Sequence, residues 1–150
     1  VQPLTHFDFS ACQLALFSPG GKVSAEYAPK AAAAGCIVID NTSHFRMDDD
    51  IPLVVPEINA KALKDFHKRR IIANPNCSTI QLVMALKPLH DLAPIKRVVV
   101  STYQSVSGAG KEAMDELFHQ TRGVLVNDAA EPNKFVKPIA FNIIPQIDVF

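Results

Sequence analysis

The residue best suited to chemistry is Cys77, which directly follows the segment Asn74-Pro75-Asn76. The pattern of apolar residues predicts a short strand before this segment and an amphipathic helix after it. A thiol at the start of a helix lies near the positive end of the helix dipole and near unpaired backbone N–H groups, both of which favour the thiolate. The same N–H groups can bind an oxyanion. Cys77 is therefore a candidate nucleophile.

The helix alone does not activate this thiol. A helix terminus stabilises a nearby negative charge by roughly 0.3–1 kcal/mol, so Cys77 also needs a nearby base. The alternative is an inert core cysteine, and this interpretation is favoured for Cys12 and Cys36, which lie in or beside apolar strands. The cysteines are too scattered for a structural zinc and the five histidines lack metal-ligand spacing, so we predict no metal site.

Two other positions carry weaker signals. Gly20 follows the first predicted strand, within the turn signal Ser18-Pro19-Gly20-Gly21. Taken alone, Arg46 is an arginine of a polar loop, and its position favours a surface ion pair with the neighbouring Asp48, Asp49 or Asp50.

Composition restricts the class of protein. The 150 residues include 48% hydrophobic and 20% charged residues, which is typical of a globular chain. Fifteen basic and fifteen acidic residues cancel, and no apolar run is long enough to span a bilayer, so we expect neither a nucleic-acid nor a membrane partner. An odd number of cysteines favours a reducing compartment, and we expect a cytoplasmic protein. The start at Val1 and the end in an apolar run suggest part of a longer chain.

The elements that must position these residues alternate between strand and helix. We predict strands at 13–17, 36–40 and 71–73 and helices at 22–34, 58–68 and 78–92, with a kink or early end at Pro29 and a bend at Pro88. This order predicts an α/β fold with a parallel, doubly wound sheet. The later residues suggest an α+β region, with strands at 96–104 and 141–147, a helix at 110–120 and a loop at 123–138. We therefore place a domain boundary between residues 76 and 77.

Five segments resemble, in the same order, segments of the aspartate-semialdehyde dehydrogenases. They are Asp40-Asn41-Thr42-Ser43-His44-Phe45-Arg46, Asn74-Pro75-Asn76-Cys77-Ser78-Thr79, Ser101-Thr102-Tyr103-Gln104, Ser107-Gly108-Ala109-Gly110 and Phe141-Asn142-Ile143-Ile144-Pro145-Gln146-Ile147-Asp148. Related acyl-phosphate reductases share a strand–cysteine–helix layout but differ in the residues around the cysteine. The resemblance implies that residues 1–76 are part of a Rossmann-like NADP-binding domain. It also implies that residues 77–150 begin an α+β catalytic and dimerisation domain.

The resemblance implies a reaction and roles for residues. The reaction is the NADPH-dependent reduction of L-aspartyl 4-phosphate to L-aspartate 4-semialdehyde with release of phosphate, in lysine, threonine and methionine biosynthesis. Cys77 matches the nucleophile that forms a thioester, Asn76 would position the substrate or oxyanion, and Gln104 matches the substrate-binding glutamine. Arg46 matches the phosphate-binding arginine.

The cofactor and partner follow from the same resemblance. Ser107 and Gly108 match positions that contact the cofactor, NADP, and Gly20 is a further cofactor-binding candidate. The resemblance also implies a homodimer built through the second domain.

Some features of the family are not found in these 150 residues. They are the Gly-rich dinucleotide fingerprint, the general-base histidine, the substrate-binding arginine and the phosphate-binding lysine. We therefore expect the 150-residue chain alone to be inactive and prone to aggregate, with apolar faces and sheet edges uncovered. Two other classes stay open: a thiol hydrolase that uses Cys77 without a nicotinamide, and a non-catalytic binding or scaffold protein with an unreactive Cys77.

Overall fold

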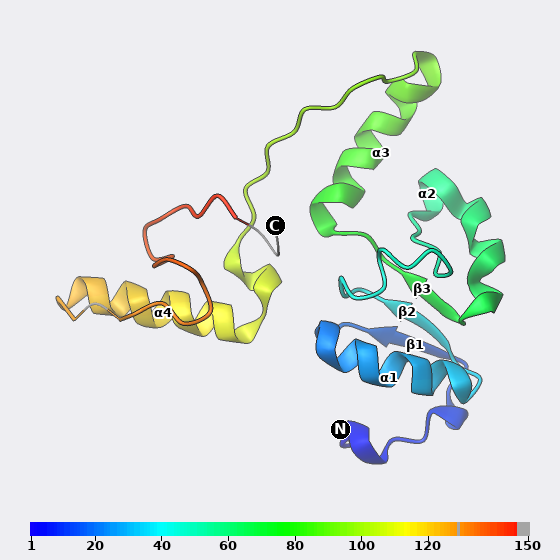
Figure 1. The fold of residues 1–150 in the computed structure, drawn as a ribbon, viewed down its shortest axis with the longest axis horizontal. Helices are drawn as coiled ribbons and strands as arrows, with labels where there is room; N and C mark the ends of the chain where they lie inside the picture. The colour runs from blue at the N-terminus through cyan, green and yellow to red at the C-terminus, as the bar shows by residue number, and fades with distance from the viewer. Residues whose placement is uncertain (129, 147–150) are drawn as a thin grey trace. The chain divides into compact units, whose positions relative to one another are not determined.

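The computed structural model describes residues 1–128 and 130–146 (Figure 1). The chain divides into two compact units, Val1–Val100 and Ser101–Phe150. The boundary predicted between residues 76 and 77 falls inside the first unit and stays a prediction about domains.

A three-stranded parallel sheet forms the centre of the first unit, in the order β1-β2-β3. Its strands are β1 (Leu14–Phe17), β2 (Ile37–Asp40) and β3 (Ile71–Ala73). Beyond β3, a single parallel bridge joins Leu53 to Ala73. The predicted parallel α/β fold is therefore confirmed for this unit, and the three strands lie where the apolar runs placed them.

Helix α1 (Gly21–Ala33) packs against the sheet through buried alanines, Ala28, Ala31 and Ala32. These small side chains let the helix approach the buried Val38 and Ile71 closely. Of the two outcomes predicted at Pro29, a kink or an early helix end, the early end is wrong, because α1 continues through Pro29 to Ala33. A proline removes one backbone donor from a helix, and here the packed alanines on both sides of it keep the helix on the sheet. Gly35, with a φ of 99°, follows the helix end as predicted.

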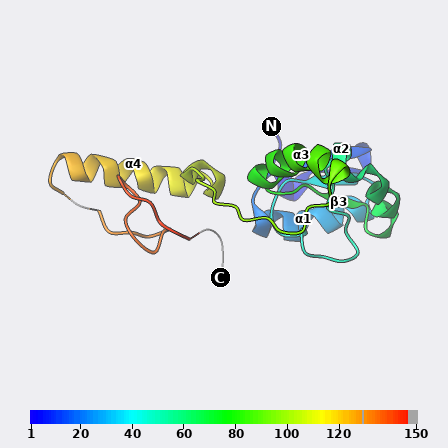
Figure 2. The ribbon, with the colours of Figure 1, turned by 90° about the horizontal axis from the view of Figure 1, so that it is seen from above.

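The other helices of this unit follow β2 and β3. The segment predicted as one helix at 58–68 consists of α2 (Pro56–Asn59) and a 3-10 helix, Ala60–Lys68. Helix α3 (Cys77–Leu92) runs through Pro88. Figure 2 shows α1 on one side of the sheet and α2 and α3 on the other, which is the doubly wound arrangement that the sequence predicts.

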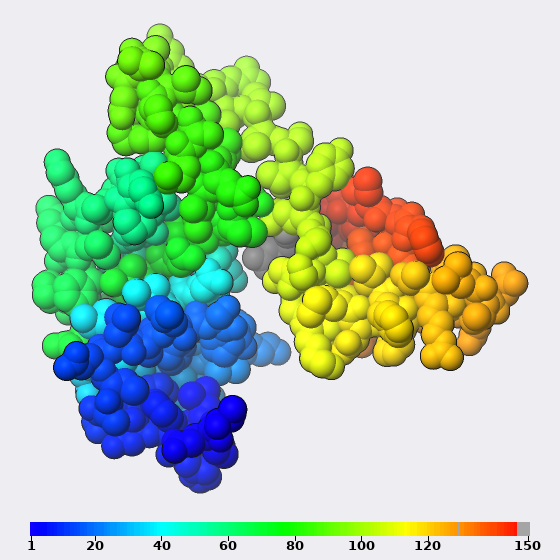
Figure 3. Space-filling model, turned by 180° about the vertical axis from the view of Figure 1, so that it is seen from behind, coloured from blue at the N-terminus to red at the C-terminus, as the bar shows by residue number. Residues whose placement is uncertain are grey.

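The residues before β1 also join the core of the first unit. They form two single-turn 3-10 helices, Leu4–His6 and Phe9–Ala11. Phe9 and Cys12 pack against the buried cluster, and the Phe9 ring lies 6.2 Å from that of Phe17. Figure 3 shows this segment, in dark blue, against the rest of the unit.

The second unit contains a short 3-10 helix, Val106–Ala109, and helix α4 (Lys111–Leu125), which is longer than the predicted 110–120. The strands predicted at 96–104 and 141–147 are wrong for the described residues, where both segments are irregular. Residue 147 lies outside the described part. A strand forms only where a neighbouring strand pairs with its backbone, and Val98, Val99 and Val100 remain largely exposed. In the described part of the chain, no helix is long and apolar enough to cross a membrane.

Candidate active site

The loops that follow β1, β2 and β3 gather at one edge of the sheet, because the carboxyl ends of parallel strands lie together. Hydrogen bonds join these loops from strand to strand. Asn74 Nδ2 donates to Asn41 Oδ1 at 2.6 Å, and Asn41 Nδ2 donates to Ser18 Oγ at 3.5 Å. This edge therefore brings together four of the predicted site residues: Gly20, Arg46, Asn76 and Cys77.

Cys77 is the first residue of α3, and its side chain is exposed. The prediction of a cysteine at a strand-to-helix junction is confirmed, and the thiol is open to a reactant. Asn76 caps the helix, because its Oδ1 accepts a hydrogen bond from Ser78 N at 3.0 Å and lies 4.0 Å from Cys77 Sγ. The cap therefore uses one N–H group that the sequence analysis assigned to an oxyanion. Asparagine is a preferred N-cap residue, so the sequence contained this signal.

The other two cysteines have different environments. Cys36 is fully buried, and burial raises the pKa of its thiol, with a smaller contribution from Cys12. Cys12 is half-buried against the core. The prediction that Cys36 is a core residue is thus confirmed, and Cys77 is the cysteine that solvent reaches most freely.

Arg46 connects two of the loops. Its Nε donates to the carbonyl oxygen of Asn74 at 2.9 Å, and its Nη2 donates to that of Asn41 at 3.1 Å. Asp50, one of the aspartates considered as an ion-pair partner for Arg46, pairs instead with Arg69. Its Oδ2 lies 2.9 Å from Arg69 Nη1. Two of the three guanidinium nitrogens of Arg46 therefore hold the main chain, and Nη1 is the one that these two bonds do not use.

Gly20 precedes α1 and has a φ of 92°, in the region that favours glycine. A Cβ added at Gly20 would meet nothing within 4 Å, so the backbone is open to an approaching group. The start of α1 is a suitable place for an anion, because its first N–H groups point outward and the helix dipole is positive there.

A buried polar cluster lies at the same edge and was not predicted from the sequence. The carboxyl group of Asp40, at the end of β2, is completely buried and accepts hydrogen bonds from the hydroxyl groups of Ser24 and Thr42. An aspartate that ends an otherwise apolar strand was the available signal. Among the described residues, no group of three or more His, Cys, Asp or Glu side chains could hold a metal ion.

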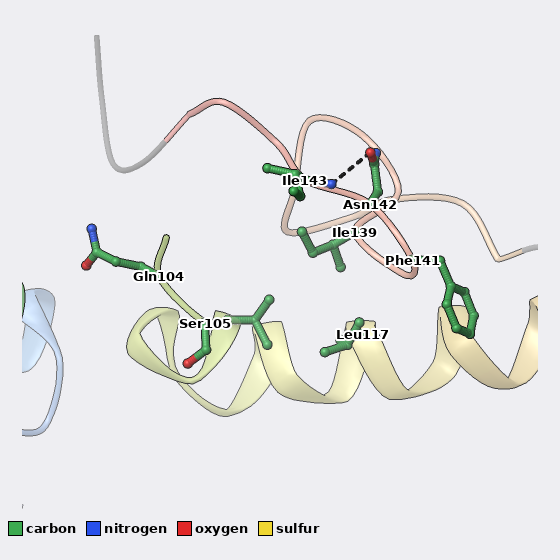
Figure 4. Close-up of a pocket in the computed structure, with 8 residues that line it drawn as sticks. Gln104, Ser105, Leu117, Ile139, Phe141, Asn142 and Ile143 are labelled. Atoms are coloured by element: carbon green, nitrogen blue, oxygen red, sulfur yellow. Dashed lines mark hydrogen bonds between the residues drawn. The ribbon is translucent and has the colours of Figure 1, made fainter. Parts of the chain in front are cut away.

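The remaining predicted site residues belong to the second unit. Gln104 lines an open pocket together with Ser105, Val106, Leu117, Ile139, Phe141, Asn142 and Ile143. Figure 4 shows the Gln104 amide pointing away from Leu117 and Phe141. Ser107 and Gly108 lie in the 3-10 helix before α4, where Ser107 Oγ is 2.6 Å from Ser105 Oγ.

Two side chains of α4 bind backbone N–H groups of later residues, and one of those residues, Ile139, lines this pocket. Glu116 accepts hydrogen bonds from the backbone N–H groups of Asn133, Lys134 and Phe135. Gln120, only 2% exposed, accepts from the backbone of Ile139 at 2.7 Å, which lines the pocket. The sequence contained no local signal for either contact, because the partners lie about twenty residues further along the chain.

Comparison with known proteins defines the class. A family model described as "Semialdehyde dehydrogenase, NAD binding domain" matches residues 1–66. A second, described as "Semialdehyde dehydrogenase, dimerisation domain", matches residues 86–150. The chain that has this fold and the cysteine at the β3–α3 junction thus also matches two domain models of the semialdehyde dehydrogenases.

Individual relatives narrow this class. Aspartate-semialdehyde dehydrogenase 2 of Vibrio cholerae is 60% identical over 150 residues, which are 100% of this chain and 44% of the relative. Aspartate-semialdehyde dehydrogenase of Aquifex aeolicus is 57% identical over 143 residues, 95% of this chain and 42% of the relative. The crystal structure of the V. cholerae enzyme II complexed with ASA matches with a TM-score of 0.91 and 59% identity, over 99% of this chain and 44% of that one.

A solved structure of lower sequence identity also matches this chain. A probable aspartate-semialdehyde dehydrogenase from Pseudomonas aeruginosa matches with a TM-score of 0.76 and 30% identity, over 97% of this chain and 43% of that one. The chain belongs to the aspartate-semialdehyde dehydrogenase family, and it spans about 44% of the length of the first of these relatives.

Proposed function

We propose that the full-length protein reduces L-aspartyl 4-phosphate to L-aspartate 4-semialdehyde with NADPH and releases phosphate, in lysine, threonine and methionine biosynthesis. The observation that carries this proposal is the exposed Cys77 thiol at the start of α3, in a chain of this family. Arg46 and Gly20 lie in the neighbouring loops of the same sheet edge, and they supply a cation and an open backbone turn.

Cys77 acts as the nucleophile in this reaction. Its thiolate attacks the acyl carbon, the bond from that carbon to the phosphate oxygen breaks, and a thioester forms while phosphate leaves. Arg46 holds the phosphate, and a guanidinium fixed by two main-chain carbonyls presents its remaining N–H donors in a constant direction. Asn76, next to the thiol, positions the substrate carbonyl, and Gln104 binds the substrate.

A nicotinamide dinucleotide suits the turn between β1 and α1. Gly20 has no side chain to obstruct it, and the start of α1 favours an anionic phosphate. When bound, the dinucleotide supplies the hydride that brings the thioester to the aldehyde level. Ser107 and Gly108 contact the cofactor, and we propose that this cofactor is NADP.

The partner and location belong to the same proposal. The model that matches residues 86–150 describes a dimerisation domain, and we propose that the protein is a cytoplasmic homodimer without nucleic-acid or membrane partners. The 150-residue chain by itself should be inactive, because it spans less than half of the relatives.

The test is a cysteine replacement in the full-length protein. Cys77→Ser should lower phosphate-dependent NADP reduction by about 10³-fold or more, while Cys12→Ser, at the half-buried cysteine, should retain most of it. Wild-type turnover in Cys77→Ser would overturn the proposal. Cys77-dependent hydrolysis of an acyl substrate without nicotinamide would point to a thiol hydrolase. An inactive wild-type protein whose Cys77 resists iodoacetamide would indicate a non-catalytic binding role.

A further inference from the structure

The side chain of Asp40 makes hydrogen bonds that the end of a strand does not require. Its Oδ1 accepts a hydrogen bond from Ser24 Oγ at 2.6 Å, and its Oδ2 accepts one from Thr42 Oγ1 at 2.6 Å. Asp40 and Ser24 are completely buried, and Thr42 is only 8% exposed. Because each oxygen of the carboxyl group accepts from a different hydroxyl, the three side chains form a closed cluster.

This cluster connects the loops that carry the proposed site. Ser24 lies in the first turn of α1, where its N–H donates to the carbonyl of Gly20 at 3.1 Å. Thr42 lies in the loop that leads to Arg46, and its Oγ1 also accepts from the backbone N–H of His44 at 3.3 Å. The carboxyl group of Asp40 therefore bonds to Ser24, which is itself bonded to the proposed cofactor turn, and to Thr42 in the proposed phosphate loop.

The main chain of Asp40 extends the connection to the nucleophile. Its carbonyl oxygen accepts from the backbone N–H of Asn74 at 2.8 Å, three residues before Cys77. Arg46 also connects the loop after β2 to the loop after β3, through its hydrogen bond to the Asn74 carbonyl. Asp40 is thus bonded to the first turn of α1 and to the loops that follow β2 and β3.

Stability alone does not explain a buried carboxyl group at this position. Burying a charge costs free energy unless it is fully hydrogen-bonded, and an apolar residue of similar volume is often as stable. What two short hydrogen bonds to an acidic group provide is a fixed geometry between the segments that donate them. A displacement of about 1 Å in a positioned catalytic group can cost 10²-fold in rate.

We propose that Asp40 is a positioning residue that fixes the phosphate loop at Arg46 relative to the turn at Gly20, through its hydrogen bonds to Thr42 and Ser24. This inference rests on the proposed function, because it assigns phosphate to Arg46. Thr42 is the best residue to change, because it can lose its hydroxyl group at nearly constant shape and leaves the acidic group itself in place.

The experiment compares Thr42→Val with Thr42→Ser in the full-length protein. Thr42→Val should raise the KM for inorganic phosphate, in the phosphate-dependent oxidation of the aldehyde, by about tenfold or more. The KM for the aldehyde should change less. Thr42→Ser keeps the hydroxyl group and should restore the KM for phosphate to within about threefold of the wild type. Thr121→Val is the matched control, because Thr121 donates to the Leu117 carbonyl at 2.7 Å in the second unit and should leave this KM unchanged.

Equal phosphate KM values in Thr42→Val and the wild type would overturn the proposal, as would equal increases in Thr42→Val and Thr42→Ser. Should Thr42→Val not fold, Ser24→Ala tests the other half of the cluster. We expect it to raise the KM for the dinucleotide, and an unchanged KM would overturn the proposal.

Failure of the proposed function would appear in the wild type itself, as no phosphate-dependent turnover. In that case amide exchange at His44 and Arg46 still tests the cluster: faster exchange in Thr42→Val than in Thr121→Val supports it, and equal exchange overturns it.

Discussion

The carboxylate of Glu116 holds the loop at residues 133–135 against α4, and Glu116→Ala should release that loop. The backbone N–H groups of Asn133 and Phe135 donate to Glu116 Oε1 at 3.2 and 3.5 Å, and that of Lys134 donates to Oε2. Gln120 Nε2 also donates to Oε1, at 2.9 Å. Alanine leaves three consecutive N–H groups without this acceptor.

The size of the effect follows from the kind of bond that is lost. A hydrogen bond to a charged group contributes about 1.5–3 kcal/mol, and we assign one such contribution to the loop as a whole because it lies partly in solvent. A tenfold change corresponds to about 1.4 kcal/mol. Amide hydrogen exchange at residues 133–135 should therefore be roughly 10- to 100-fold faster in the Glu116→Ala variant of the full-length protein.

The same contact predicts how the loop responds to pH. Burial raises the pKa of Glu116, but the backbone N–H groups of Lys134, Asn133 and Phe135 and the Gln120 amide together lower it below the ordinary value of 4.5. A lowered folded-state pKa means that the stabilisation is fully present above pH 4.5 and is lost as the pH falls through the lower folded value. Protection of these amides, corrected for intrinsic exchange, should therefore decrease below pH 4.5 in the wild type and not in Glu116→Ala.

A glutamate one turn earlier provides the control. Glu112 Oε2 lies 3.6 Å from Lys134 Nζ in an exposed ion pair, and such pairs contribute about 0–1 kcal/mol. Glu112→Ala should accelerate exchange by less than about fivefold. The reasoning is refuted if Glu116→Ala exchanges like the wild type, or if Glu112→Ala is as fast as Glu116→Ala.

Two further predictions concern the first unit. At neutral pH, iodoacetamide should modify the exposed Cys77 well before the buried Cys36, whose thiol pKa is raised by burial; mass spectrometry of a time course measures this, and equal rates would contradict the structure. Gly20→Ala should lower the free energy of unfolding by about 1–3 kcal/mol, because a φ of 92° with a ψ of 152° lies in a backbone region that is essentially restricted to glycine. Gly21→Ala is its control and should change stability little, because the added Cβ would meet only His44 Cβ, at an ordinary 3.9 Å; equal losses in denaturant titrations would contradict the explanation.

The sequence was sufficient for features that neighbouring residues determine. The alternation of apolar runs and helical patterns predicted the parallel sheet and the junction at which Cys77 lies, since each strand and helix shows its own periodicity. The same reasoning failed for residues 96–104, where an apolar alternation is present but no described segment pairs with it. Backbone pairing depends on a partner, and a local pattern does not contain that information.

Only the tertiary structure decided which polar groups meet. Ser24 and Asp40 are 16 residues apart, Arg46 and Asn74 are 28 apart, and Glu116 and Lys134 are 18 apart. Composition and spacing identified Arg46 as a cation in a loop, but not the two carbonyl groups that orient it. The residues that can carry chemistry are determined by the sequence itself. Their directions and supports are set by parallel strands that bring distant loops to one edge of a sheet, because hydrogen bonds form wherever the fold places donor and acceptor together.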